Sequence, residues 1–184
     1  MTLKSLALLS CTLSFLTVQP ALAATWTVDP ALSTLGFEVQ QGSSALTGRF
    51  TSWDASIEFD PDAPENADIS ATIRPASAST GNAQFDGTLP NGDWFDTAAF
   101  PDATFTADNV ERVEGDSYRA NGTLTIKGVS MPLALDFTLA INGDTATANG
   151  VATLNRIEYG LGSGVGTDTV GDAVTVTLNL TATR

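Results

Sequence analysis

Side chains that commonly carry out enzyme chemistry are scarce in this 184-residue chain. There is no histidine, which removes the commonest general base and the commonest zinc ligand. Two carboxylates could hydrolyse a glycosidic bond, and Glu58, Asp93, Asp96 and Glu158 are available for such a pair. Their spacing singles out no pair among 21 acidic residues. We therefore expect a protein that is not an enzyme and needs no cofactor.

One acidic stretch resembles a loose calcium loop. Residues 60–68, DPDAPENAD, space Asp60, Asp62, Asn66 and Asp68 in this way. The stretch lacks the central glycine and the terminal glutamate of an EF-hand. Its proline and asparagine content already explains it as a turn, so we predict no metal site.

Two basic residues stand out in this acidic chain. Arg156, in LNRIEYG, has a planar guanidinium that suits the phosphate or carboxylate head group of a ligand. The alternative is an internal ion pair with one of the many acids, which their number favours. Lys127, in TIKGV, is interpreted as a solvated turn or strand end.

Aromatic residues gather in a stretch with the composition of a loop. Residues 91–105, NGDWFDTAAFPDATF, hold four of the fourteen aromatics in the chain, and Phe85 lies just upstream. We predict that residues 82–100 form short helical turns across one end of a barrel, as a lid. The inward aromatics of this lid would be Phe85, Trp94, Phe95 and Phe100.

The alternative is that these aromatics only complete the core. Between the two neighbours in the lid, we assign Trp94 to the ligand, because an indole suits a boundary between apolar and wet regions. Phe95 would pack on the barrel rim, although the two roles could be exchanged. Phe105 would enter the next strand after Pro101.

The first 23 residues have the pattern of a secretory signal peptide. Lys4 precedes an apolar run from Leu6 to Val18, and Ala21-Leu22-Ala23 is an A-x-A cleavage signal. The apolar run is too short for a membrane anchor. We predict cleavage after Ala23, a periplasmic or secreted protein, and one domain over residues 24–184.

Cleavage there would remove the only cysteine, Cys11, and one lysine, but no acid. The remaining 21 acidic residues stand against seven basic ones, a net charge of −14. Such a charge disfavours binding to nucleic acid or to anionic lipid surfaces. We expect no nucleic-acid partner and no stable membrane insertion.

Apolar residues recur with a period of two, which is typical of half-buried antiparallel strands. Residues 129–141, VSMPLALDFTLAI, and 172–184, DAVTVTLNLTATR, show the pattern best. We count about eight strands in residues 24–184. Glycines within the strands (Gly36, Gly48, Gly122 and Gly150) favour a barrel over a sandwich, because closure needs bends. The apolar interior is either packed solid or wide enough for one elongated ligand.

Several blocks together resemble the YceI-like family. They include DWFDTAAFPDATF, GTLTIKGV, and Arg156 followed by Tyr159-Gly160. The resemblance covers essentially all of residues 24–184 and implies an eight-stranded, lipocalin-like antiparallel barrel, usually in the periplasm. It also implies a polyisoprenoid or similar lipid in the pore. Gln40-Gln41 and Gln84-Phe85 depart from the usual family pattern, and this points to a different head-group preference.

Our leading hypothesis is a binding protein for a long-chain isoprenoid or another lipid. The alternative is a structural or interaction module with a packed core. The small inward residues argue against it, because they leave room for a tunnel: Ala55, Ala71, Ala120, Gly122 and Ala152. The sequence leaves monomer and dimer open. Candidate ligand-binding residues of the pore and lid are Phe37, Trp53, Phe85, Trp94, Phe95, Phe100, Phe105, Leu124, Ile126, Leu135 and Phe137, and Arg156 is the head-group candidate.

Overall fold

The computed structural model describes residues 23–184, and the predicted signal peptide, apart from Ala23, lies outside them. The strands are β1 (Ala24–Val28), β2 (Thr34–Gln41), β3 (Ser44–Phe50), β4 (Trp53–Phe59), β5 (Asp68–Ile73), β6 (Ala78–Ser79), β7 (Ala103–Glu114), β8 (Ser117–Ile126), β9 (Val129–Asn142), β10 (Thr145–Asn155) and β11 (Val170–Thr183). The helices are α1 (Ala83–Thr88) and the short 3₁₀ turns η1 (Pro64–Asn66), η2 (Pro75–Ser77) and η3 (Arg156–Tyr159). No helix within residues 23–184 is long and apolar enough to span a bilayer.

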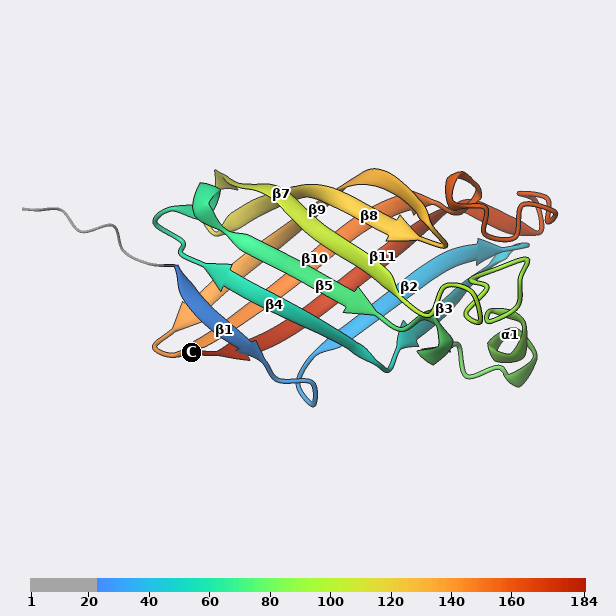
Figure 1. Ribbon diagram of the computed structural model, residues 1–184, viewed down its shortest axis with the longest axis horizontal. Coiled ribbons are helices and arrows are strands. Elements are labelled where there is room, and N and C mark those ends of the chain that lie inside the picture. Colours follow the sequence, from blue (N-terminus) through green and yellow to red (C-terminus); the bar gives the residue numbers. More distant parts are fainter. Residues whose placement is uncertain (1–22) are drawn as a thin grey trace, which may run out of the picture.

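All the strands belong to one antiparallel sheet that closes on itself through β1 and β11. β1 and β2 both pair with β11. On their other sides, β1 pairs with β4 and β2 pairs with β3. β4 then pairs with β5, and β3 pairs with β6. β1 with β2, β3 with β4, and β5 with β6 are therefore each one strand broken by a bend, and the eleven segments build the eight-stranded barrel that the sequence predicts (Figure 1).

Alternation along the strands sorts side chains to the two faces of the wall. In β8, Tyr118, Ala120, Leu124 and Ile126 are buried, while the residues between them, apart from Gly122, are more exposed. The same period of two runs through β9 and β10. The inner face is therefore apolar, and Thr, Asn and charged side chains cover the outside.

One end of the barrel, near the C-terminus, is filled by large side chains. Trp26 and Phe59 are each 4% exposed, and the indole Nε1 of Trp26 donates a hydrogen bond to the Phe59 carbonyl at 3.1 Å. The Phe59 ring meets Tyr118 edge-on at 5.5 Å between centroids, and Tyr118 stacks on Phe137 at 5.4 Å. These contacts anchor the closed end of the core.

The space left by some small residues is taken up by neighbouring rings. A Cβ placed on Gly122 would clash with the Thr106 carbonyl oxygen and lie only 2.8 Å from the Phe105 ring, so this glycine makes room for both the backbone and a side chain of the adjacent strand. Ala120 and Ala152 are buried as well. At these positions, small residues do not by themselves leave a tunnel.

The inner face of β9 is packed differently from that of β8. Its inward side chains, from Met131 and Leu133 through Phe137 to Ile141, are all only half-buried. Since β8 and β9 pair along their whole shared length, the difference does not come from a missing neighbour on that side. The apolar interior is less completely filled along β9.

Candidate ligand-binding site

The lid begins with α1, which side-chain hydrogen bonds fix to the residues that precede it. The Asn82 side chain caps it by accepting a hydrogen bond from the Gln84 amide at 2.9 Å. The Asp86 carboxylate accepts bonds from the Thr80 amide at 2.6 Å, the Thr80 hydroxyl at 2.7 Å and the Ser79 hydroxyl at 3.0 Å. The Thr80 amide is the main reason why the pKa of Asp86 is lowered. These bonds tie α1 to the end of β6.

The rest of the lid is a series of turns without regular helix. The Phe95 amide donates to the Leu89 carbonyl at 3.0 Å, and the Phe100 amide donates to the Asp96 carbonyl at 2.8 Å. Lys127, in the β8–β9 hairpin turn, donates from Nζ to the Gly92 carbonyl at 2.5 Å. The segment therefore lies across the end of the barrel opposite the C-terminus (Figure 1).

The aromatics of the lid point in different directions, and all of them are half-buried. Phe95 meets the Phe50 ring at 6.1 Å between centroids, and Phe50 meets Phe37 at 5.3 Å. Phe100 lies against Gly128, where a Cβ would be 3.0 Å from its ring. The lid is thus joined by aromatic contacts both to β2 and β3 and to the β8–β9 hairpin.

Trp94 packs toward the loop that follows η3. A Cβ on Gly162 would lie 2.7 Å from the indole, so only glycine leaves room for this ring. The Gly162 amide donates to the Asp93 carbonyl at 2.6 Å. The Arg156 guanidinium carbon lies 5.7 Å from the centre of the same indole. Trp94 therefore fastens the lid to the 160–171 loop.

Arg156 is 1% exposed, and the hydrogen bonds that its guanidinium donates go to the backbone. Nε donates to the Gly171 carbonyl at 2.9 Å. The two terminal nitrogens donate in pairs, at 2.7 to 2.9 Å, to the carbonyls of Leu161, Gly162, Val165 and Val170. Such charge-assisted bonds offset the cost of burying the cation.

This geometry differs from both predictions made for Arg156, a contact with a ligand head group and an internal ion pair. Each of its five N–H groups already has a carbonyl acceptor. No donor is left for a head group, and the partners are backbone oxygens where an acidic side chain was the alternative. Arg156 organises the loop at the lid end of the barrel.

The other predicted residues form part of the inner wall. Phe105, Leu124 and Ile126 are buried, whereas Trp53, Leu135 and Phe137 are half-buried beside the same core. Leu135 also lies 3.0 Å from a Cβ placed on Gly150 of β10. The residues are thus spread along the wall, and only the lid residues gather at one place.

Between β9 and β10 the wall is incomplete. The two strands pair from Asn142 and Thr145 as far as Asp136 and Val151, and the pairing stops there. Residues 129–135 remain paired with β8, and residues 152–155 remain paired with β11. The strands separate toward the lid end, where a cavity of about 280 Å³ lies between them.

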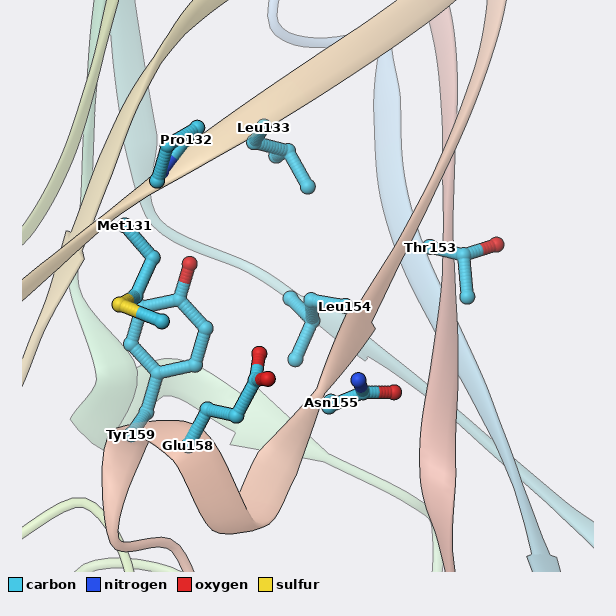
Figure 2. A pocket seen from close by; sticks show the side chains of 8 residues that line it. All are labelled: Met131, Pro132, Leu133, Thr153, Leu154, Asn155, Glu158 and Tyr159. Atoms are coloured by element: carbon cyan, nitrogen blue, oxygen red, sulfur yellow. The ribbon is translucent and has the colours of Figure 1, made fainter.

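Residues of β9, β10 and η3 line this β9–β10 cleft, as Figure 2 shows: Met131, Pro132, Leu133, Thr153, Leu154, Asn155, Glu158 and Tyr159. The Tyr159 ring lies beside Met131, and the Glu158 carboxylate points into the space between the strands (Figure 2). Sequence reasoning did not assign these residues to a binding site. The signal that could have found them is Pro132, since a proline within a strand pattern marks an edge or a bulge.

A second cavity, of about 440 Å³, involves mainly outward residues of β8, β9 and β10. It is lined partly by Val113, which is 59% exposed, and by Val151. The ion pair between Arg119 and Asp136, with Nε and Oδ1 at 2.6 Å, lies beside it. Because its lining is mostly outward-facing, this cavity differs in kind from the apolar interior.

The comparison with known proteins decides the family. Residues 26–182 match the YceI-like domain. The chain belongs to the YceI-like family. A UPF0312 protein of Photorhabdus laumondii is 36% identical over 143 residues, which cover 76% of this chain and 74% of that protein.

Two solved structures share the barrel. BcnA of Burkholderia cenocepacia superposes with a TM-score of 0.80 at 31% identity, covering 85% of this chain and 99% of that one. A polyisoprenoid-binding domain of Saccharophagus degradans superposes with a TM-score of 0.67 at 18% identity, covering 88% and 99%. The family and the closed eight-stranded barrel with one short helix, both predicted from the sequence, are confirmed.

Proposed function

We propose that this YceI-like protein binds a polyisoprenoid or a similar long-chain amphiphile inside its barrel and does no catalysis. The observation that carries the proposal is the inner face of β9. Its apolar side chains alternate without interruption, and each of them stays half-buried on the inside of the barrel. An elongated apolar ligand would complete their burial, which is favourable by roughly 25 cal/mol per Å².

The proposed wall of the site comprises Phe37, Trp53, Phe105, Leu124, Ile126, Leu135 and Phe137, and the lid aromatics cover its end. The polyisoprenoid-binding domain of S. degradans, which shares the fold, supports the ligand class. The signal-peptide pattern of residues 1–23 supports a periplasmic or secreted location. The acidic balance of the chain supports a role away from nucleic acid.

The proposal is tested by isolating the protein from its native host without detergent and analysing it by native mass spectrometry. We expect complexes heavier than the polypeptide, and solvent extraction should release a long-chain lipid. Protein that carries no lipid, and takes none up from a mixture of prenols and quinones, would favour the packed interaction module instead.

Two neighbouring substitutions separate binding from folding. Trp94→Ala should lower the affinity for a long prenol on the order of tenfold, because the lid loses its contact with the 160–171 loop. Phe95→Ala should mainly lower the free energy of unfolding, by about 1–3 kcal/mol, since Phe95 packs on Phe50 but is only half-buried. Thermal melts with and without a fluorescent prenol distinguish the two effects. Equal binding by both variants and the wild type would show that the segment is no lid.

A further inference from the structure

A missing backbone N–H on the edge of β9 that faces β10 explains why the two strands separate there. Lys127 and Gly128 both have positive φ, 51° and 75°, in the two-residue turn between β8 and β9. Such a type I′ turn makes Ile126 and Val129 a hydrogen-bonded pair. By the alternation of an antiparallel ladder, the backbone groups of residue 132 then face β10. Proline has no N–H to offer there.

In the register of the paired part, Pro132 would face Asn155, and Leu133 would face Leu154. The ladder ends before it reaches these positions. Met131, Leu133 and Leu154 belong both to the cleft and to the apolar cluster inside the barrel. The cleft is therefore continuous with the inner face.

The mouth of the cleft is polar, and the charge it carries is negative. Thr153, Asn155, Glu158 and the buried Tyr159 contribute to its lining, which includes no lysine or arginine. The nearby Arg156 donates its N–H groups to backbone carbonyls. Burial, and then the charge of Glu158, raise the pKa of Tyr159, so its hydroxyl stays protonated and can donate a hydrogen bond.

We propose that the β9–β10 cleft holds the polar head of the bound amphiphile, and that this head is an uncharged hydroxyl-bearing group rather than a phosphate. This inference rests on the proposed function. The chain of the ligand would lie along Leu133 and Leu154, and its hydroxyl would donate to Glu158. A phosphate would meet the Glu158 carboxylate with no free cation to balance its charge.

The test compares a long polyprenol with the monophosphate of the same alcohol, using tryptophan fluorescence to measure both affinities. The wild type should bind the alcohol more tightly. Glu158→Lys should shift the affinity ratio toward the phosphate by roughly tenfold, since it replaces a repulsive charge with an attractive one. Glu158 is exposed, so the fold should tolerate the change. The control is Glu58→Lys, which makes the same charge change on the outward-facing side of β4.

The outcomes separate the two proposals. Binding of neither lipid by the wild type overturns the proposed function, and the inference with it. If both lipids bind but Glu158→Lys leaves their ratio unchanged, or Glu58→Lys shifts it equally, the function stands and the cleft is not the head-group site. Equal affinity of the wild type for the two lipids also contradicts the inference.

Discussion

The two sides of β9 differ sharply. Toward β8, every residue from Val129 to Thr138 has a partner, and outward side chains reinforce the seam. Arg119 binds Asp136 through two hydrogen bonds, at 2.6 and 3.1 Å, and the hydroxyls of Thr125 and Ser130 lie 2.8 Å apart. Toward β10, the pairing stops at Asp136. The contrast indicates that the barrel wall is continuous between β8 and β9, whereas the cleft between β9 and β10 gives access to the interior.

The contrast extends to the two ends of the barrel. The closed end is filled by apolar rings around Trp26 and Tyr118. The lid end is organised around a buried cation, Arg156, and the backbone carbonyls that surround it. The polar contacts of Arg156 fix the loops at this end.

The largest effect is expected at Arg156. Arg156→Met should lower the free energy of unfolding by about 3–5 kcal/mol, because it leaves five buried or partly buried carbonyls without their donor. Arg156→Lys should recover little, since one ammonium cannot serve acceptors arranged around a planar fork. Urea denaturation measures both changes. A loss below about 1 kcal/mol for Arg156→Met would contradict a structural role.

A matched pair of leucines compares the packing of β8 and β9. Leu124→Ala on β8 removes a side chain that is 8% exposed and should cost about 2–5 kcal/mol of stability. Leu133→Ala on β9 removes a half-buried one and should cost about half as much. The same denaturation measurement applies. Equal losses would show that the interior along β9 is as tightly filled as that along β8.

Much of this fold could be predicted from the sequence, because alternation with a period of two records directly which residues face inward. The lid could also be located, since four aromatics in a loop-like segment need an apolar surface to cover. The direction of each ring could not be predicted. The orientation of the Trp94 indole, for example, depends on the space above Gly162, which lies 68 positions away in the chain. Arg156 was singled out by its rarity, but its partners are backbone groups, and these leave no signature in residue types.

A smaller effect is expected when Pro132 is replaced. Pro132→Ala restores an N–H on the edge of β9 that faces β10, so the cleft should narrow as the ladder extends toward Asn155. We expect slower amide hydrogen exchange at Thr153 and Asn155, whose backbone N–H groups face β9, and a gain in stability of no more than about 1 kcal/mol. Ser130→Ala, which alters the same strand without adding a donor, is the control. Unchanged exchange in Pro132→Ala would mean that the missing N–H is not what keeps the strands apart.

The smallest effect concerns the sealed seam at low pH. The hydrogen bond from Arg119 is the main cause that lowers the pKa of Asp136 below 3.8. A carboxyl group whose pKa is lower in the folded state stabilises the protein at pH values above its pKa in the unfolded state. This stabilisation is lost as the pH falls through its pKa in the folded state. Asp136→Asn should therefore lower the melting temperature at pH 7 by about 1–2 °C, because the pair is half-exposed. The difference in melting temperature between the wild type and Asp136→Asn should vanish well below pH 3.8. A constant difference from pH 7 down to that pH would show that the ion pair is not its source.

A crystal structure of the protein loaded with a long polyprenol would show directly whether the barrel interior binds a lipid. We expect continuous ligand density along the inward side chains of β9, from Phe137 past Leu133, with the hydroxyl end between Leu154 and Glu158. Density confined to the outer cavity beside Val113 and Val151, or an interior closed by side chains with no ligand in it, would show that the lipid does not bind along β9.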